Sequence, residues 1–348
     1  MTPASRPAPG SSDRGGATIA QIAGLAGVST ATVSKVVNGR ADVAPDTRAA
    51  VEHIIHEYGY RRPRKGARPT LVELVLHEIK GAYGMEVIKG VERVAVEHEL
   101  ALVVSELQES RVPGRNWIEA VLARRPAGVV AVMDGPTPAQ QEQLRSRGIP
   151  LALVDPAGEP GPELPSTSGD NWGGGLAATR HLLRLGHRRI AAITGPPSSL
   201  PSRARLDGYR TALDTAGVAV DPGLVRVGGF HLEDGLARGL DLLTLPDPPT
   251  AVFAFNDAQA IGVYQAAHRL GLRVPRDLSV VGFDDLPTAT WAIPALTTVR
   301  QPLRDMAATA TRVVIDLARG ATATGYRSMF ATELVVRAST APPGADEH

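Results

Sequence analysis

Two patterns of apolar residues divide the chain into two unlike parts. Between Ala17 and Tyr60, apolar residues recur at the period of an α-helix in three short stretches. After residue 70, the chain instead alternates short apolar runs with amphipathic segments of ten to fifteen residues. The first pattern predicts a small helical unit, and the second predicts a larger α/β body.

The first part predicts two helices joined by a tight corner, with a third helix after them. Gly27 interrupts the first helical pattern, and Ser29 is a favourable N-cap for a second helix that buries Val33 and Val36. The third helix is predicted from Pro45 to Tyr58. The other side of the second helix is short, polar or basic, which suits a helix in a DNA groove. An ordinary helical hairpin with a solvated face is the alternative.

Eight apolar runs predict the strands of the body. They lie at residues 71–76, 100–105, 128–133, 150–155, 189–195, 224–229, 250–255 and 278–283. Amphipathic segments such as 172–185, 203–216 and 258–270 predict helices between them. Apolar strands that alternate with helices form parallel sheets covered on both faces. Eight strands are too many for one compact nucleotide-binding unit, so we predict two doubly wound subdomains with a ligand cleft at the carboxyl ends of the strands.

The same patterns predict the domain boundaries. We expect a disordered tail over 1–16, a helix-turn-helix domain over 17–60, a basic linker over 61–70, a core over 71–340 and a tail over 341–348. A loop rich in Pro and Gly at 157–168 divides the core. The first subdomain is expected over about 71–168 plus 302–325, and the second over about 169–301 plus 326–340.

Composition excludes several classes of protein. The 348 residues contain no cysteine, so there is no disulfide framework and no thiolate metal site. We find no signal peptide and no apolar run of the ~18 residues that a membrane span needs, so we expect a cytoplasmic protein without a membrane partner. Residues 1–69 carry ten Lys or Arg and five Asp or Glu, whereas the remainder carries 27 and 31. A basic end on a mildly acidic body suits a nucleic-acid module joined to a domain that binds something else.

Basic residues crowd the predicted linker, and no acid lies among them. They are Arg61, Arg62, Arg64, Lys65 and Arg68. Pro63, Gly66 and Pro69 oppose helix formation in this segment. We therefore predict a basic arm that places arginines on phosphates or in the narrow groove of DNA. A solvated flexible tether is the alternative.

Polar side chains follow the predicted strands at the points where a ligand in the cleft would meet them. They are Asp155, Arg203, Arg205, Asn256, Asp257, Asp284, Asp285, Arg300 and Gln301. Their carboxylate, amide and guanidinium groups can form paired hydrogen bonds with vicinal hydroxyls. Tyr83, Phe230 and Trp291 could supply flat apolar faces for a sugar ring. Any one Asp or Asn could instead cap a helix, but the convergence of five strand ends favours a binding cleft.

Enzyme motifs are missing from the sequence. There is no P-loop, and GDNWGGG at 169–175 lacks the spacing of a dinucleotide-binding fingerprint. His181, His187 and His268 lie singly, without metal-ligand spacing, and no serine stands in a nucleophile elbow. We therefore expect no catalytic function, no cofactor and no metal.

Three phrases in the helical part, AGVS, TATVSKVVNG and VAPDTRAAVEHIIHEYGY, resemble the DNA-binding headpiece of the LacI family of bacterial transcription regulators. The resemblance implies that Thr30, Ala31 and Lys35 occupy base-reading positions at the start of the recognition helix. It places Thr18, Ser29, Thr32, Ser34 and Asn38 at phosphate-contact positions. Because Ala31 is too small to hydrogen-bond, Thr30 and Lys35 should carry most of the direct readout.

The body resembles the same family. GGLAATRHLLRLGHRRIAAITG, SRARLDGYRTAL, FNDAQAIGVYQAAHRLGLRVPRDLSVVGFDDL and LTTVRQP follow in the family's order. The resemblance implies a periplasmic-binding-protein-like core with a small effector, usually a sugar, sugar phosphate or purine, between the subdomains. The positions that it assigns to the effector are Tyr83, Asp155, Arg205, Phe230, Asn256, Asp284 and Gln301. The linker departs from the family pattern, since Ala67-Arg68 is followed by Pro69-Thr70 and not by a leucine.

We therefore predict an α/β protein with a three-helix helix-turn-helix headpiece and a core of two doubly wound parallel-sheet subdomains. The predicted function is a transcription repressor that binds double-stranded, palindromic operator DNA as a homodimer, since one headpiece makes few contacts. A saccharide is the expected effector, and the residues leave open whether it releases or strengthens operator binding. The alternative is a periplasmic sugar-binding protein, which should carry a signal peptide and lack a basic headpiece.

Overall fold

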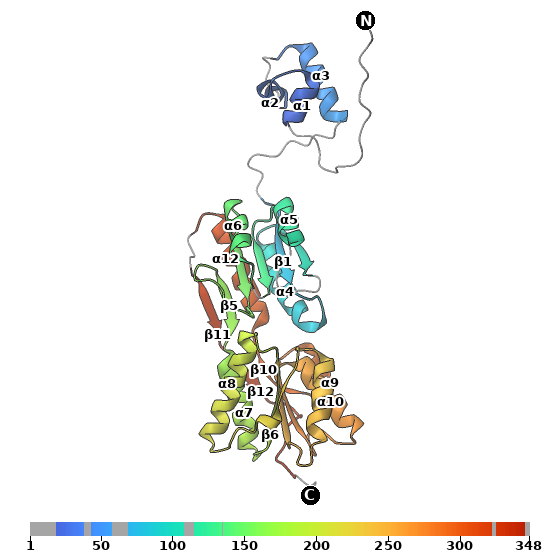
Figure 1. The fold of residues 1–348 in the computed structure, drawn as a ribbon, viewed down its shortest axis with the longest axis vertical. Coiled ribbons are helices and arrows are strands. Elements are labelled where there is room, and N and C mark those ends of the chain that lie inside the picture. Colours follow the sequence, from blue (N-terminus) through green and yellow to red (C-terminus); the bar gives the residue numbers. More distant parts are fainter. Residues whose placement is uncertain are drawn as a thin grey trace. The chain divides into compact units, whose positions relative to one another are not determined.

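The structure, a computed structural model, describes residues 19–37, 43–57, 69–107, 115–133, 135–321 and 325–344. The chain divides into two units, Met1–Ala67 and Arg68–His348. In the first unit, α1 (Ile19–Ala26), α2 (Thr30–Val37) and α3 (Pro45–Glu57) pack around one small core (Figure 1). Helix α3 ends at Glu57, so Tyr58, predicted as its last residue, lies outside the described residues.

The helical period explains the core of the first unit. Ile22, Val33 and Val51, one from each helix, are fully buried. Gly27 has a φ of +64°, a left-handed conformation that costs glycine little, and it lets the chain turn sharply between α1 and α2. The three predicted helices are therefore present, with the corner at the predicted glycine.

The second unit contains two six-stranded sheets with the same order of strands. The first has the order β11-β5-β4-β3-β1-β2, and the second has the order β12-β10-β9-β8-β6-β7. The strands of the first sheet are β1 (Leu71–Leu76), β2 (Ala101–Glu106), β3 (Val129–Val132), β4 (Leu151–Val154), β5 (Ser166–Gly169) and β11 (Arg327–Phe330). The strands of the second are β6 (Ile190–Thr194), β7 (Val225–Val227), β8 (Ala251–Ala254), β9 (Ser279–Asp284), β10 (Thr297–Arg300) and β12 (Glu333–Val335). Neighbouring strands are parallel except for β10 and β12, so the predicted fold class is confirmed.

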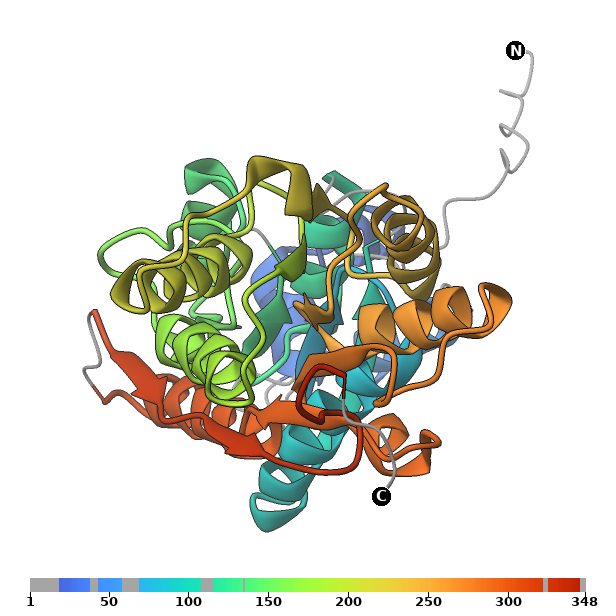
Figure 2. The same cartoon turned by 90° about the horizontal axis from the view of Figure 1, so that it is seen from below.

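Helices cover both faces of each sheet (Figures 1 and 2). On the first sheet, α4 (Gly81–Glu97) and α12 (Leu303–Ala318) share one face, and α5 (Arg115–Arg124) and α6 (Pro138–Ser146) share the other. On the second sheet, α7 (Asn171–Arg184) and α8 (Leu200–Thr215) lie opposite α9 (Leu232–Leu243) and α10 (Asp257–Arg269). The short elements are α11 (Pro287–Trp291) and the 3-10 turn η1 (Pro222–Leu224). None of the helices in the described ranges is both long and apolar enough to cross a membrane.

The alternation of side chains along each strand accounts for these two layers. Leu74 and Leu76 of β1 belong to the core beneath α4 and α12, whereas Val75 belongs to the core beneath α5 and α6. A strand covered on both faces buries nearly all of its side chains and is therefore mostly apolar, which is why the predicted apolar runs coincide with strands.

The chain crosses between the two sheets three times, after β5, after β10 and after β11. The third crossing corrects the expected boundary at residue 326. Strand β11 pairs with β5 in the first sheet, so the chain returns to the second sheet only after Phe330. The eight apolar runs correspond to β1–β4 and β6–β9, and they missed β5, β10, β11 and β12, which are short and carry polar residues; β5 reads STSG and begins inside the expected loop at 157–168.

Two glycines allow α7 and α8 to pack closely. A Cβ at Gly208 would overlap the carbonyl oxygen of Trp172, and a Cβ at Gly175 would overlap the carbonyl oxygen of Arg205. Each glycine therefore faces the backbone of the other helix, and neither position has room for a side chain.

We expect Gly208→Ala to lower the free energy of unfolding of the second unit by about 1–3 kcal/mol, because α8 must move away from α7. Urea unfolding followed by circular dichroism measures this change. Gly161→Ala is the matched control, since a Cβ at Gly161 would meet open space. Equal losses in the two variants would show that the close helix contact does not limit stability.

Candidate functional site

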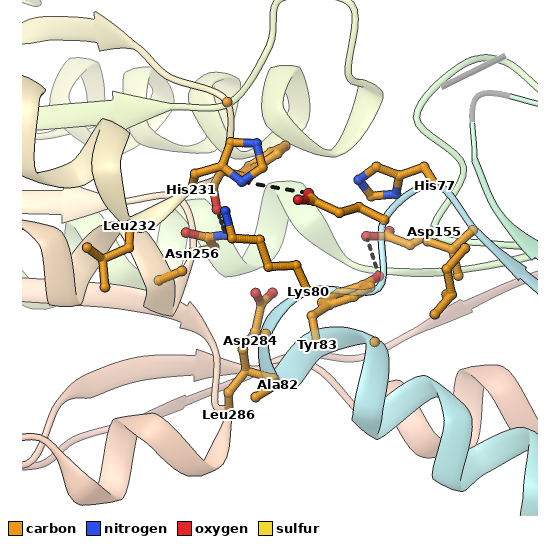
Figure 3. A pocket seen from close by; sticks show the side chains of 18 of the residues that line it. His77, Lys80, Ala82, Tyr83, Asp155, His231, Leu232, Asn256, Asp284 and Leu286 are labelled. Carbon is orange, nitrogen blue, oxygen red and sulfur yellow. Dashed lines mark hydrogen bonds and ion pairs between the residues drawn. The ribbon is translucent and has the colours of Figure 1, made fainter. Parts of the chain in front are cut away.

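A cavity of about 440 Å³ lies between the two sheets, at the carboxyl ends of their strands (Figure 3). Its walls come from the loops and helix starts that follow β1, β3, β4, β6, β7, β8 and β9. Open parallel sheets bind ligands at this edge, and the cavity is of the size of small-molecule sites. Much of the lining is apolar, including Leu76, Met133, Leu232, Ile261 and Leu286.

Six of the seven residues expected to contact an effector line this pocket. Tyr83 and Asp155 come from the half with the first sheet, and Arg205, Phe230, Asn256 and Asp284 come from the half with the second sheet. Figure 3 shows Tyr83 and Asp155 on one side of the cavity and Asn256 and Asp284 on the other. The structure thus brings together side chains that lie up to 201 positions apart in the sequence.

Gln301 and Trp291 do not line the pocket. Gln301 is buried, and its Nε2 donates to Oδ1 of Asp284 over 2.7 Å, so it contacts a pocket residue and not the cavity. It follows directly on β10, which pairs with β9, and this register brings its amide to Asp284. Trp291, considered as a flat face for a sugar ring, has 74% of its surface exposed to solvent.

Arg205 is buried beside the pocket and its guanidinium is held on several sides. Its Nε donates to Oδ1 of Asn171 over 2.8 Å, and Nη1 donates to the carbonyl oxygen of Phe255. Nη2 lies 3.8 Å from Oδ1 of Asp284, and the guanidinium stacks 3.7 Å from the ring centre of Phe283. Such contacts fix the orientation of the side chain.

Burial perturbs two of the carboxyl groups that line the pocket. Burial raises the pKa of Asp284 to about 7, although Arg205 and the hydrogen bond from Gln301 oppose the shift. Burial also raises the pKa of Asp155, against the effects of Arg205, Asn171 and Tyr83. The pKa of Tyr83 is raised as well, by burial and then by the nearby Asp155, to which its hydroxyl donates over 3.5 Å. Perturbed acids in a cleft are typical of functional sites.

Three residues that line the pocket have an unusual backbone conformation. Asp155, Phe230 and Asp284 have φ angles of +47°, +73° and +109°, which side-chain-bearing residues rarely adopt. The ring of Phe230 lies against Gly195, where a Cβ would overlap it. Strained residues of this kind persist where the surrounding structure holds them, often at ligand sites.

Charged residues at the pocket that the sequence analysis did not name come from both halves. Glu78 and Lys80 follow β1, and His231 precedes α9. Nδ1 of His231 lies 3.8 Å from a carboxylate oxygen of Glu78, so a protonated His231 would form an ion pair between the two halves. Glu78 and Lys80 follow the first predicted strand, just as Asp155 and Asn256 follow later strands, so their position after a strand end is the sequence signal that marks them.

The polar residues that follow β8 and β9 also have structural roles. Asn256 does both jobs: its Oδ1 accepts from the backbone N–H of Gln259 over 2.8 Å, and it also lines the pocket. Asp257 is buried, where it accepts from the N–H of Leu286 and from the hydroxyl of Thr298. Asp285 pairs with Arg300 and Arg337. Asp257 and Asp285 therefore stabilise the frame of the pocket without lining it.

The first unit presents part of the expected DNA-binding surface. Thr30, Ala31 and Lys35 are exposed on α2. The hydroxyl of Ser29 accepts from the N–H of Thr32 over 3.1 Å, which is the predicted N-cap; Thr32 and Ser34 are partly buried. Seven further expected DNA contacts lie outside the described residues: Thr18, Asn38, Arg61, Arg62, Arg64, Lys65 and Arg68. Within the described part of the chain, no group of three or more His, Asp or Glu could hold a metal ion.

Comparison with known proteins gives two family matches. Residues 18–63 match the family described as "Bacterial regulatory proteins, lacI family", and residues 179–340 match the "Periplasmic binding protein-like domain". The HTH-type transcriptional regulator DegA of Bacillus subtilis (strain 168) is 32% identical over 335 residues, which cover 93% of this chain and 98% of DegA.

Solved structures agree with these matches. The transcriptional regulator CelR in complex with cellobiose is 33% identical, with a TM-score of 0.71, over 93% of this chain and 99% of CelR. The lac repressor dimer bound to operator and the anti-inducer ONPF is 27% identical, with a TM-score of 0.69, over 94% of this chain and all of that chain.

The raised pKa of Asp284 predicts a pH dependence of stability. The folded protein keeps a proton on Asp284 up to about pH 7, whereas the unfolded chain releases it near 3.8. The free energy of unfolding should therefore fall as pH rises from about 4 to about 7, and Asp284→Asn should remove this part of the fall. Urea unfolding at a series of pH values measures both slopes.

Asp214→Asn is the control for this measurement, because Asp214 is exposed on α8. We expect it to keep the wild-type slope. Coincident slopes for wild type and Asp284→Asn would contradict a proton on Asp284 near neutral pH.

Proposed function

Because the chain belongs to the LacI family of bacterial regulatory proteins, it is a DNA-binding transcription regulator and not an enzyme, and we propose that a saccharide in its pocket controls its binding to operator DNA. The observation that carries this proposal is the convergence of six polar and aromatic residues from both halves on one cavity. Asp155, Arg205, Asn256 and Asp284 offer donors and acceptors for hydroxyl groups.

The rest of the pocket also suits a sugar. Tyr83 and Phe230 provide flat faces for the apolar side of a ring, and the lining around them is largely apolar. The related regulator CelR forms a complex with cellobiose, which makes an oligosaccharide the first ligand to test here. Ligand hydroxyls can also supply hydrogen bonds to the buried carboxyl groups of Asp155 and Asp284, whose pKa values burial raises.

A ligand that contacts both halves favours one arrangement of them over another. A saccharide held by Asp155 from one half and by Asp284 from the other stabilises the arrangement in which both contacts are made. The coupling between pocket and operator is then the difference in saccharide affinity between the two arrangements, about 1–3 kcal/mol in typical allosteric proteins.

We propose that the DNA-binding form is a homodimer that acts as a repressor in the cytoplasm. A single three-helix headpiece offers few contacts, and two-fold symmetry doubles them on a palindromic operator. The lac repressor, which is similar over nearly the whole chain, binds its operator as a dimer. The basic residues between Arg61 and Arg68 would add contacts to the phosphates next to each headpiece.

A thermal-shift screen of saccharides, beginning with cellobiose and followed by operator binding with each hit, tests the proposal. We expect at least one saccharide to raise the melting temperature and to change operator affinity. A protein that binds a saccharide but no DNA at moderate salt would instead support a plain sugar-binding role.

Arg205→Ala should weaken the saccharide found in this screen about 100-fold or more, because a buried charged donor is lost. Operator binding in the absence of saccharide should persist. Arg203→Ala, an exposed position on the same helix outside the pocket, is the matched control and should leave both unchanged. Arg205→Lys keeps the positive charge but lacks the planar, bidentate guanidinium, so its saccharide affinity should lie between those of the two alanine variants. A normal saccharide response in a folded Arg205→Ala protein would remove Arg205 from the ligand site.

Lys35→Ala should lower discrimination between operator and scrambled DNA by about 1–3 kcal/mol, since a lysine on the recognition helix can reach guanine acceptors. The measurement is the ratio of the two dissociation constants at fixed salt. Arg48→Ala removes one positive charge from α3 and should weaken the binding of operator and of scrambled DNA by the same factor. The ratio of the two dissociation constants should therefore stay unchanged. An unchanged ratio in Lys35→Ala would rule out a base-reading role.

A further inference from the structure

Asn171 is a buried polar residue at the first crossing between the sheets. It is the first residue of α7, two positions after the end of β5, and 7% of its surface is exposed. It is absent from the lining of the pocket, and it falls in the segment GDNWGGG, which matches no dinucleotide-binding fingerprint.

The amide of Asn171 lies between two charged pocket residues. Its Oδ1 accepts from Nε of Arg205 over 2.8 Å. Its Nδ2 donates to the carbonyl oxygen of Gly169 over 3.1 Å and to Oδ1 of Asp155 over 3.4 Å. An amide can accept from the cation and donate to the anion at once, which a carboxylate or an apolar side chain of similar size cannot do.

These contacts join the two halves of the molecule. Asp155 follows β4 of the first sheet and also accepts from the hydroxyl of Tyr83, whereas Arg205 lies on α8 and contacts Asp284 at the end of β9. Asn171 therefore connects a polar chain from Tyr83 through Asp155 and Arg205 to Asp284.

The same crossing is bonded to the third crossing of the chain. The N–H of Asp170 donates to the carbonyl oxygen of Phe330 over 2.8 Å, and the hydroxyl of Thr332 donates to the carbonyl oxygen of Asp170 over 3.1 Å. The first and third crossings are therefore bonded to each other at the residue that precedes Asn171.

We propose that Asn171 is a positioning residue, whose amide holds Asp155 and Arg205 in register across the crossing so that ligand contacts made by one half depend on the other. This inference rests on the proposed function for its ligand, cellobiose in the first instance. The role is indirect, since Asn171 acts through Asp155 and Arg205 and does not line the cavity.

A readout without ligand separates positioning from a general loss of packing. The charged or titratable groups that act on Asp155 are Tyr83 from α4, Arg205 from α8 and Asp284 from β9. The neutral amide of Asn171 acts on it through a hydrogen bond. The hydrogen bond from Asn171 lowers the pKa of Asp155, so Asn171→Ala should extend the fall in the free energy of unfolding to higher pH. A packing defect alone would lower stability equally at every pH.

The test compares pH profiles of stability for wild type, Asn171→Ala, Asp155→Asn and the double variant. We expect Asn171→Ala to change the pH profile of stability when it is introduced into the wild type. Introduced into Asp155→Asn, it should leave the pH profile unchanged. Asn116→Ala, the same substitution at an exposed site near the start of α5, should leave the profile unchanged. An unaltered profile in Asn171→Ala would overturn the proposal.

The second arm measures cellobiose affinity. Asn171→Ala and the size-matched Asn171→Asp should each weaken the binding of cellobiose about tenfold. Asn171→Ala loses the hydrogen bonds to Asp155 and Arg205, whereas the new carboxylate in Asn171→Asp repels Asp155. Wild-type affinity in either variant would also overturn the proposal. If wild type binds no saccharide, the proposed function fails, while the pH profiles still decide the role of Asn171.

Discussion

A guanidinium removed from water keeps its charge and needs hydrogen-bond partners for its N–H groups. Arg205 is such a buried guanidinium, and the surrounding elements of the second unit must supply its partners. Its partners are Asn171 from the start of α7, the carbonyl oxygen of Phe255 after β8, and Asp284 and Phe283 of β9. Each partner is fixed by a different element, so the cation ties the positions of these elements together. Loss of any one partner leaves a buried donor or charge unmatched, which costs more than the hydrogen bond itself contributes.

The close packing of α8 on α7 is what brings Arg205 to this position. Gly175 and Gly208 let the two backbones approach, and a side chain at either glycine would push α8, with Arg205, away from the pocket. The residues with strained backbone are held by other contacts: Gln301 donates to the side chain of Asp284, and Asn256 donates to the carbonyl oxygen of Phe230. Stability and ligand recognition therefore share one set of contacts, and a saccharide would enter a pocket whose polar groups are already oriented.

The two units divide the work of a regulator. The first has a small core centred on Ile22, Val33 and Val51, and leaves the polar face of α2 exposed for DNA. The second buries far more apolar surface and contains the pocket. The linker over residues 61–70 departs from the sequence pattern that the rest of the chain shares with the LacI family, since Ala67-Arg68 is followed by Pro69-Thr70 and not by a leucine.

The sequence by itself determined the two-part organisation, the three headpiece helices, and eight strands of the core. It did so because helical period and continuous apolar runs report burial directly. It did not predict β5, whose small polar residues give no apolar signal; the hydroxyl of Thr167 there donates to the carbonyl oxygen of Met306 in α12, far along the chain. It likewise placed the return to the second sheet too early, since the pairing of β11 with β5 joins segments about 160 residues apart.

The sequence also gathered the polar residues of the site, because parallel strands bring their carboxyl ends to one edge. Which of these residues face the cavity was decided only by tertiary structure. Asp284 lines it while its neighbour Asp285 pairs with two arginines, and Gln301 holds Asp284 from outside the cavity. Asn171 had no local pattern to mark it, because its role depends on Asp155 and Arg205, which come from other elements of the chain. A sequence pattern reports how a residue relates to its neighbours in the chain, whereas a binding site is made of contacts between residues that only the fold brings together.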